Sequence, residues 1–249
     1  MNSGELINHT DSWAPESPNN NGFATPAAVD SQDSNQRTII ITGFGPFGDH
    51  DVNASSEVVN ALRNRRFGRT LALPANVKCI FVDNIKVAFD DVRAEIPRLW
   101  EAHKPSLMVH LGVIKDTNTV LLEQRAVNRM GGKDVNGVCP SNQAIDCDAG
   151  NTDAYCSTSL DLSKICQRLM SDDSQNPDEL SVPVAVSHDA GQYLCNFAYF
   201  LSLRRDSGRS VFIHIPPLDQ PYSLKKLVEI IIRIVELLIE QAFSRSTKS

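Results

Sequence analysis

One cysteine lies where a nucleophile is expected. The stretch VPVAVSHDAGQYLCNFAYFLSL predicts a strand at 182–187, a turn at 188–191 and a helix whose first turn contains Cys195. Backbone N–H groups in the first turn of a helix carry a partial positive charge, which favours a thiolate over a thiol. Since the thiolate is the nucleophilic form of cysteine, position 195 suits covalent catalysis. Packing within the helix is the alternative, because free cysteine is among the most buried residue types.

A histidine is expected beside this cysteine. His214 ends the apolar part of SVFIHIPP, at the carboxyl edge where open α/β sheets assemble their sites. The next parallel strand after the cysteine's helix brings His214 next to Cys195, where an imidazole can activate the sulfur and later protonate a leaving amine. A histidine buried for packing is the alternative, and it is the preferred interpretation of His110 in LMVHLGV. His188 is a second candidate base.

A glutamate is the third candidate catalytic group. Glu123 lies in the extended segment TVLLEQRAVN, where the neighbouring residues that indicate burial are Leu121, Leu122, Ala126 and Val127. A buried carboxylate without a partner is costly, whereas a carboxylate beside a histidine orients the ring and favours its charged form. A solvated surface glutamate is the alternative.

A glycine-rich loop follows the first apolar strand. GFGPFG at 43–48 has the G-x-G-x-x-G spacing of a dinucleotide site, but the next helix is predicted to begin only near Ala54. The nearest acidic candidate for a ribose, Asp83, lies about 40 residues past the first glycine rather than about 20. Phe44 and Phe47 suit an apolar wall better than a pyrophosphate. We therefore favour a small-molecule pocket in which glycines let a ligand approach the backbone, with a structural turn and a nucleotide site as alternatives.

Composition excludes several classes of protein. The chain has 249 residues and a net charge of -6, and it contains no basic cluster that would bind nucleic acid or an anionic membrane. The longest apolar run, LVEIIIRIVELLIEQAF, is interrupted by charges every three or four residues, so it predicts an amphipathic helix and not a membrane span. Six cysteines contain no C-x-x-C pair, and the first residues lack a secretory signal. We therefore expect reduced thiols, no zinc site and a cytosolic location.

The elements that would position these residues alternate in type. The pattern predicts strands at 38–42, 77–84, 107–113, 182–187 and 210–217, and helices from about 53–65, 90–103, 159–171, 193–205 and 223–243. Pro97 marks a kink or a late start of the second helix, and 129–153 is a long polar loop. This alternation predicts an α/β fold, a single-domain three-layer α/β/α sandwich with a mostly parallel open twisted sheet, over residues 37–245. Residues 1–36, rich in Asn, Ser and Pro, are predicted to be a disordered tail.

The same motifs carry a resemblance to a known family. GFGPFG at 43–48 followed by VNAS at 52–55, Leu122-Glu123 with Asn128, AGQYLCN at 190–196 and FIHIP at 212–216 resemble, in this order, the pyroglutamyl peptidase I (pyrrolidone-carboxylate peptidase) family of cysteine peptidases. The resemblance covers about residues 38–242. It implies an open α/β/α fold and a cytosolic omega-peptidase that removes N-terminal pyroglutamate from peptides.

The resemblance also implies the roles of single residues. Carried over motif by motif, the catalytic residues are Glu123, Cys195 and His214, and the substrate-binding residues are Phe44, Phe47, Asn53 and Tyr193. The phenylalanines would hold the lactam ring. No metal or organic cofactor is implied, and the expected partners are pyroglutamyl peptides, with the protein a monomer or a weak homo-oligomer.

One segment departs from the family pattern. Microbial members carry small, glycine-rich residues after the strand equivalent to 107–113, whereas this chain has IKDTN at 114–118. No arginine of the NRMGGKDVNG stretch is a secure counterpart of the family's oxyanion-assisting arginine, although Arg129 and Lys133 are candidates. A homologue that binds pyroglutamyl peptides but is catalytically impaired is therefore the alternative function.

Overall fold

The structure is a computed structural model that describes residues 36–48, 52–140, 143–146, 148, 150–175 and 182–245. Apart from Gln36, the predicted tail lies outside these residues. The strands are β1 (Arg37–Phe44), β2 (Val77–Ile85), β3 (Leu107–Val113), β4 (Val120–Glu123), β5 (Arg125–Val127), β6 (Tyr155–Ser157), β7 (Val184–Ser187) and β8 (Ser210–Ile215). The helices are α1 (Ala54–Arg63), α2 (Phe89–His103), α3 (Leu162–Gln175), α4 (Leu194–Arg205) and α5 (Leu224–Arg245).

Six strands form the central sheet, in the order β2-β1-β3-β8-β4-β7. The strands β2, β1, β3 and β8 are mutually parallel, whereas β4 pairs with β8 in the antiparallel sense and with β7 in the parallel sense. The expected mostly parallel sheet is therefore confirmed, with two strands at one side running the opposite way. The carboxyl ends of β1, β3 and β8 consequently meet at one edge of the sheet, where α/β proteins place their sites.

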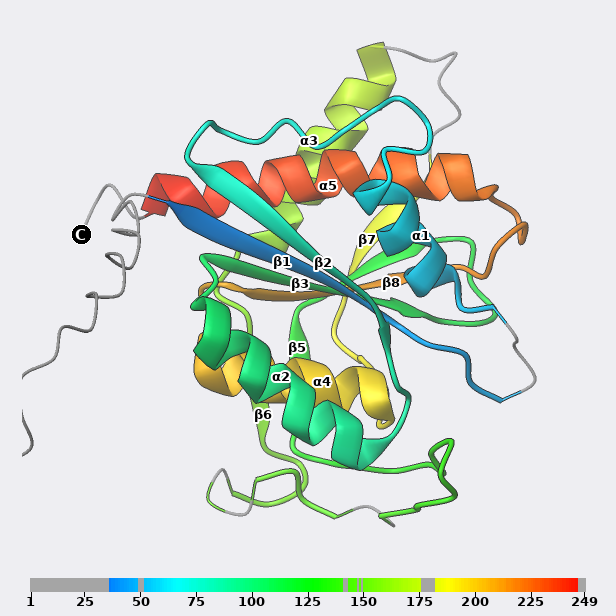
Figure 1. Ribbon diagram of the computed structural model, residues 1–249, viewed down its shortest axis with the longest axis vertical. Coiled ribbons are helices and arrows are strands. Elements are labelled where there is room, and N and C mark those ends of the chain that lie inside the picture. The colour runs from blue at the N-terminus through cyan, green and yellow to red at the C-terminus, as the bar shows by residue number, and fades with distance from the viewer. Residues whose placement is uncertain are drawn as a thin grey trace, which may run out of the picture. The chain divides into compact units, whose positions relative to one another are not determined.

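Helices cover both faces of the sheet, which makes the predicted three layers (Figure 1). Successive strand residues point to opposite faces, so Ile40, Met108 and Phe212 join the apolar cluster beneath α2 and α4. The residues one position away belong to a second cluster, which α1, α3 and α5 cover. Burial on both faces explains why these strands read as continuous apolar runs rather than as alternating ones.

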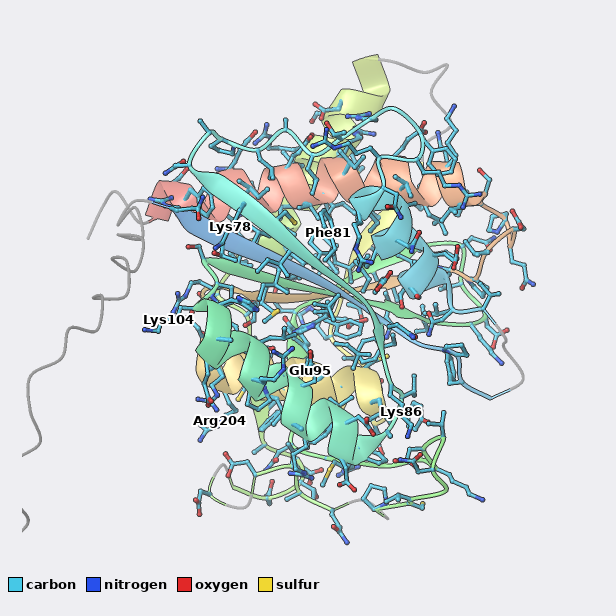
Figure 2. All side chains as sticks on the ribbon, in the orientation of Figure 1. Lys78, Phe81, Lys86, Glu95, Lys104 and Arg204 are labelled. Atoms are coloured by element: carbon cyan, nitrogen blue, oxygen red, sulfur yellow. The ribbon has the colours of Figure 1, made fainter. Side chains whose placement is uncertain are left out.

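Charged side chains lie on the outside of these layers (Figure 2). Lys104 and Arg204 are exposed at the ends of α2 and α4, and Lys78 is exposed on β2, the edge strand of the sheet. A lysine on an edge strand discourages pairing with another chain. The helix α5 follows the same rule, because its Leu227, Ile231 and similar residues are fully buried while its charges face outward. No helix in the described part of the chain is long and apolar enough to cross a membrane.

The helix α2 begins earlier than one sequence interpretation allowed. It starts at Phe89 and contains Pro97 in its interior, so a late start at the proline is wrong. Its first turn is capped from a distant loop, because Phe89 donates its backbone N–H to Oδ2 of Asp134 at 2.9 Å. A cap from 45 residues away leaves no signal in the sequence next to the helix.

The segment TVLLEQRAVN, predicted as one extended stretch, forms two strands that belong to two different sheets. After Glu123 the chain leaves the central sheet at Gln124 and continues as β5, which pairs with β6 in a separate antiparallel ribbon. The buried Asn128 then fixes the following loop, because its amide donates to the carbonyl of Asp146 at 2.8 Å and accepts from the N–H of the same residue at 2.9 Å. The strand β6 lies in a stretch that the sequence analysis did not recognise as a strand.

Candidate active site

Cys195 is the second residue of α4, as predicted. The helix has Tyr193 as its N-cap, and its first hydrogen bond runs from the N–H of Phe197 to the carbonyl of Tyr193 at 3.0 Å. The N–H groups of Leu194, Cys195 and Asn196 therefore precede the first intrahelical bond. The sulfur is thus placed at the positive end of the helix, beside three donors that helical carbonyls do not accept.

His214 lies under this cysteine. It is the fifth residue of β8 and only 3% exposed. Its side chain shares a face of the sheet with Phe212, the face that α4 covers, and the two rings are 4.8 Å apart. The thiol of Cys195 interacts with this imidazole, and the two side chains line the same cavity. The two residues that the sequence analysis expected to meet therefore lie at one site.

Glu123 binds the other nitrogen of the same ring. Oε1 of Glu123 accepts a hydrogen bond from Nδ1 of His214 at 2.7 Å, and the glutamate is completely buried. The antiparallel register explains the contact, because Glu123 pairs with Phe212, which makes His214 its diagonal neighbour on the same face. Since Nδ1 is engaged, the contact with Cys195 falls to Nε2. The predicted order of glutamate, histidine and cysteine is present.

The electrostatics of this set favour a charged imidazole. Burial alone would lower the pKa of His214, because it disfavours the charged form. Hydrogen bonds to Cys195 and Glu123, and the negative charges of these groups, outweigh burial and raise the pKa from 6.5 to about 9. His214 therefore holds its proton at neutral pH, as a group that protonates a leaving amine must.

Gly112 makes room for the sulfur, a role that the sequence analysis missed. A Cβ atom at this position of β3 would lie 3.0 Å from Sγ of Cys195 and 2.6 Å from the ring of Phe212. Gly112 also pairs directly with His214 across the strands. Any side chain at 112 would displace the nucleophile or the ring beneath it. A glycine inside a buried strand is the signal that could have found it, since such a glycine marks a close approach.

A cavity of about 280 Å³ opens beside Cys195 and His214. Its walls include all four residues predicted to bind substrate, which are Phe44, Phe47, Asn53 and Tyr193. The remaining lining residues, which the sequence analysis did not identify, are Val87, Val113, Ile114, residues 189–191 and Leu194. Most of this lining is apolar, and apart from Tyr193 its ionisable members are Cys195, His214 and the exposed Asp189. The apolar walls suit a small neutral ligand.

The glycines of the GFGPFG loop pack against protein atoms, which differs from the expectation that a ligand approaches them. A Cβ at Gly43 would lie 2.6 Å from the backbone of Ser55, and one at Gly45 would lie 2.4 Å from the side chain of Asn84. Neither glycine lines the cavity. The loop is thus tightly packed against α1 and β2, and it presents its phenylalanines to the cavity. A dinucleotide site is not supported, because such a site needs a helix that begins at the glycine loop, whereas α1 begins only at Ala54.

Asn53 joins this loop to the helix that follows. It is the N-cap of α1, where its Oδ1 accepts from the N–H of Ser55 at 3.0 Å, and its Nδ2 donates to the carbonyl of Gly45 at 2.9 Å. The same buried side chain lines the cavity. Its position therefore depends on both the loop and the helix, which fixes it.

Tyr193 forms the opposite wall. Its ring meets Phe89 edge-on at 6.2 Å, and its hydroxyl donates to the carbonyl of Lys133 at 2.9 Å. Gly132, with a φ of 81°, lies so close that a Cβ there would be 2.7 Å from the tyrosine ring. The loop at 132–134 therefore holds Tyr193 in place. Lys133 contributes its backbone to this contact and is not part of the cavity lining.

The other candidate residues lie elsewhere. His110 is fully buried between Thr42 and Ser202, whose hydroxyls lie 2.7 Å from its two ring nitrogens. It is a satisfied core histidine, as expected. His188, the second candidate base, is exposed and is absent from the cavity lining, and Arg129 pairs with Asp153 outside it. Among the described residues, no group of His, Cys, Asp and Glu could hold a metal ion.

Comparisons with known proteins agree with this geometry. The profile of a family described as pyroglutamyl peptidase matches residues 37–242. The chain is 37% identical over 202 residues to pyroglutamyl-peptidase 1 of Rattus norvegicus, covering 81% of this chain and 89% of the relative. It is 35% identical over 206 residues to pyroglutamyl-peptidase 1 of Homo sapiens, covering 82% and 91%. The solved pyrrolidone carboxyl peptidase of Pyrococcus furiosus has the same fold, with a TM-score of 0.69 at 20% identity over 82% of this chain and 99% of that chain.

Proposed function

Because the chain belongs to the pyroglutamyl peptidase family, we propose that Cys195, His214 and Glu123 carry out the hydrolysis of N-terminal pyroglutamyl residues. The protein is a cysteine omega-peptidase that acts on pyroglutamyl peptides. The observation that carries the residue assignment is one chain of contacts: Glu123 to Nδ1 of His214, and His214 to the sulfur of Cys195. This chain ends at the cavity that receives the substrate.

Acylation starts from the thiolate of Cys195. Its sulfur attacks the carbonyl carbon of the pyroglutamyl residue, and the carbonyl electrons move onto oxygen. The free N–H groups at the start of α4 stabilise this oxyanion. Nε2 of His214 gives its proton to the peptide nitrogen, the C–N bond breaks, and the shortened peptide leaves with a neutral amine. The pyroglutamyl group stays on Cys195 as a thioester.

Deacylation uses the same groups in reverse. The neutral His214 takes a proton from water, whose oxygen attacks the thioester carbon. The C–S bond then breaks, which releases pyroglutamate and restores the thiolate and the imidazolium. Glu123 keeps the ring oriented through Nδ1 and stabilises its positive charge each time it forms.

The cavity accounts for the choice of a lactam. A pyroglutamyl end carries no charge, and the flat rings of Phe44, Phe47 and Tyr193 offer it apolar surfaces. Asn53 is the polar lining residue with a fixed amide, able to bond the lactam. An ordinary N-terminal ammonium placed against these rings would lose much of its hydration, which disfavours normal peptides.

We also propose a cytosolic location and an oligomeric state for the enzyme. Cys79, Cys156, Cys166 and Cys195 are free thiols, which fits a reducing cytosol. The oligomeric state that we propose is a monomer or a weak homo-oligomer. Size-exclusion chromatography with light scattering tests the oligomeric state, and cell fractionation tests the location.

The residue assignment is tested with a pyroglutamyl arylamide. Wild-type protein should release the arylamine, and Cys195→Ala should not; full turnover by Cys195→Ala would overturn the assigned nucleophile. Saturable binding of pyroglutamate with no turnover by the wild type would instead favour the impaired homologue. Iodoacetamide should inactivate the enzyme, and a pyroglutamyl ligand should protect it. Cys139 is the internal control, because it is exposed and lies outside the cavity lining, so its labelling should not be protected.

A further inference from the structure

A second cavity lies between the loops that follow β3 and β8. It has a volume of about 480 Å³ and is lined by residues 115–118, Pro217, Gln220 and Pro221. Ile114 lines the first cavity and Lys115 lines the second, so consecutive residues of one loop take part in both. On the other strand, Pro217 follows His214 by three residues. The second cavity is therefore lined by the two loops that directly follow the strands bearing Gly112 and His214.

The order of the strands sets the direction in which a substrate lies. Phe44 ends β1 and Phe47 follows it, on one side of β3, whereas His214 is on β8, on the other side. The carbonyl under attack must lie at Cys195, between them. Because His214 protonates the leaving nitrogen, the rest of the peptide has to continue on the β8 side. The loops after β3 and β8 leave the sheet at this edge (Figure 1).

We propose that the cavity between the 115–118 loop and the 217–221 loop is the subsite that binds the leaving peptide, and this inference rests on the proposed function. Its lining suits a peptide chain: Thr117, Asn118 and Gln220 offer donors and acceptors for main-chain amides, and the two prolines give apolar surface. The IKDTN segment that departs from the family pattern forms one wall. Four of the five departing residues, 115–118, therefore bear on the leaving side, while Ile114 lines the first cavity.

Both loops are held by their own hydrogen bonds. The N–H of Asp219 donates to the carbonyl of Tyr222 at 2.9 Å, and the N–H of Thr119 donates to the hydroxyl of Thr117 at 3.1 Å. At the point where the strands end, the N–H of Ile114 donates to the carbonyl of Ile215 at 3.0 Å. A subsite that is already ordered loses little entropy when a peptide binds.

Two opposite charges face this subsite. Lys115 and Asp116 are both exposed, and neither forms an ion pair with another residue in the described ranges. Their charges offset each other, so the wild-type enzyme should show little preference between acidic and basic leaving peptides. When one charge is removed, the other is no longer offset. Removing Lys115 and removing Asp116 should therefore change the preference between acidic and basic peptides in opposite directions. Asp116 has a φ of 61°, which asparagine also tolerates, so Asp116→Asn keeps the backbone.

The test compares two peptides in each enzyme. Both begin with pyroglutamate, and one continues with two glutamates and the other with two lysines. The measured quantity is the ratio of kcat/KM for the glutamate peptide to that for the lysine peptide. Lys115→Gln should lower this ratio about threefold to fivefold, and Asp116→Asn should raise it by a similar factor, as expected for exposed charge pairs. Both changes should shrink at about 0.5 M salt, because the charges are screened.

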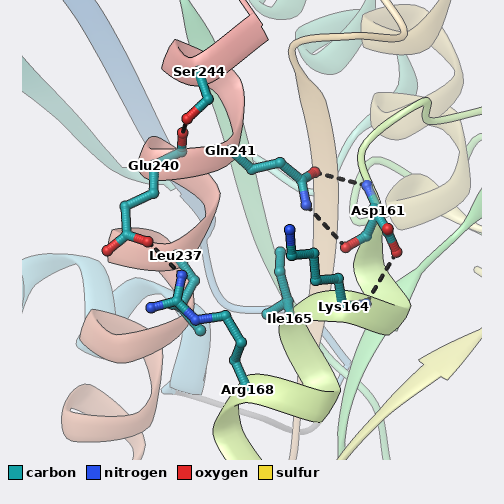
Figure 3. Close-up of a pocket in the computed structure, with 8 residues that line it drawn as sticks. All are labelled: Asp161, Lys164, Ile165, Arg168, Leu237, Glu240, Gln241 and Ser244. Carbon is teal, nitrogen blue, oxygen red and sulfur yellow. Dashed lines mark hydrogen bonds and ion pairs between the residues drawn. The ribbon is translucent and has the colours of Figure 1, made fainter.

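A matched lysine elsewhere provides the control. Lys164 is also exposed, and it lines a cavity of about 300 Å³ between α3 and α5, on the face of the sheet away from Cys195 (Figure 3). Lys164→Gln should leave the ratio unchanged. Because both peptides are measured on the same sample, loss of folded protein cancels in the ratio.

The possible results test the proposed subsite separately from the proposed function. If wild-type protein cleaves the peptides but Lys115→Gln and Asp116→Asn leave the ratio unchanged, the leaving peptide lies elsewhere and the subsite is wrong, while the proposed function stands. If both variants move the ratio in the same direction, the subsite is also wrong. If wild-type protein cleaves no pyroglutamyl substrate, the proposed function fails, and the subsite fails with it.

Discussion

Nδ1 of His214 lies 2.7 Å from Oε1 of Glu123, and both side chains are buried. The pair links two strands that run in opposite directions, β8 and β4. It fixes which ring nitrogen faces the substrate, because the nitrogen that binds the carboxylate cannot also bind the sulfur. The glutamate therefore acts on the chemistry through the histidine, and its removal should be visible as a change in the titration of that ring.

Replacing this glutamate should move the alkaline limit of activity. The carboxylate contributes to the raised pKa of His214, which lies near 9. In the proposed mechanism the imidazolium is the proton donor, so kcat/KM should fall as the pH rises through that value. In Glu123→Gln the pKa should drop, the alkaline limb should shift to lower pH, and kcat should fall about a hundredfold. The pH profile of kcat/KM for a pyroglutamyl arylamide measures the shift.

The control for this variant is Glu101→Gln. Glu101 is exposed on α2, where it pairs with Arg205 at 3.0 Å, so its replacement should leave the profile unchanged. An alkaline limb that stays in place in Glu123→Gln would mean that the carboxylate does not tune the proton donor.

A methyl group at position 112 should lower both stability and kcat, although Gly112 has no group that takes part in the reaction. In Gly112→Ala the new Cβ would lie within 3.0 Å of Sγ of Cys195 and closer still to the ring of Phe212. Because Phe212 is fully buried, the strain cannot relax freely, and overpacking of this kind costs about 1–3 kcal/mol of stability. We expect kcat to fall by about tenfold or more as the sulfur moves from its place. Thermal unfolding and steady-state kinetics measure the two effects.

The matched glycine is Gly208, which also lacks a positive φ and lies in the turn before β8. A Cβ there would lie 3.2 Å from Oδ1 of Asp206 and 3.5 Å from the hydroxyl of Ser159, far from Cys195, so Gly208→Ala should keep full kcat. Equal kcat values in Gly112→Ala and Gly208→Ala would show that the sulfur does not need the space at 112.

The elements could be predicted because local chemistry decides them. The run Ile39–Ile41 is β-branched and apolar, and it forms a strand buried on both faces, as such runs do in parallel sheets. Cys195 could be placed in the first turn of its helix because a turn precedes it. His214 could be placed at the end of its strand because prolines follow it. Each of these signals lies within a few residues of the feature that it predicts.

The features that escaped prediction depend on contacts distant in sequence. The antiparallel pairing of β4 with β8, which aligns Glu123 with His214, joins residues 91 positions apart. The role of Gly112 comes from a cysteine on another element. Asp134 caps α2 from a loop that follows it by 45 positions. A single sequence carries no pattern that reports such pairs, so the proximity of Cys195 and His214 could be predicted from the order of the elements while the register that aligns Glu123 could not.

The lactam pocket should depend on its half-buried phenylalanine. Phe47 lines the cavity but lies at its rim. In Phe47→Ala the ring surface is lost in the ground state and in the transition state alike, so KM should rise about fivefold to tenfold while kcat changes little. The comparison variant is Phe81→Ala, since Phe81 is also half-buried but packs on the opposite face of the sheet (Figure 2). An unchanged KM in Phe47→Ala would show that this ring does not contact the substrate.

The buried histidine of the core should govern stability in acid. Burial lowers the pKa of His110 from 6.5 to about 3, so the folded protein keeps this ring neutral while the unfolded chain binds a proton below pH 6.5. The contribution of His110 is therefore fully present above pH 6.5 and is lost as the pH falls toward 3. Its slope approaches about 1.4 kcal/mol per pH unit in that window.

Urea unfolding between pH 4 and 7 measures this slope in wild-type protein and in His110→Gln. The variant loses bonds to Thr42 and Ser202 and should be less stable at every pH. However, its free energy of unfolding should fall less steeply with acid, because glutamine does not titrate. His103→Gln, at the last turn of α2, is the control and should keep the wild-type slope. If His110→Gln keeps that slope too, His110 is protonated in the folded core, and its contacts with the two hydroxyls would have to be reassigned.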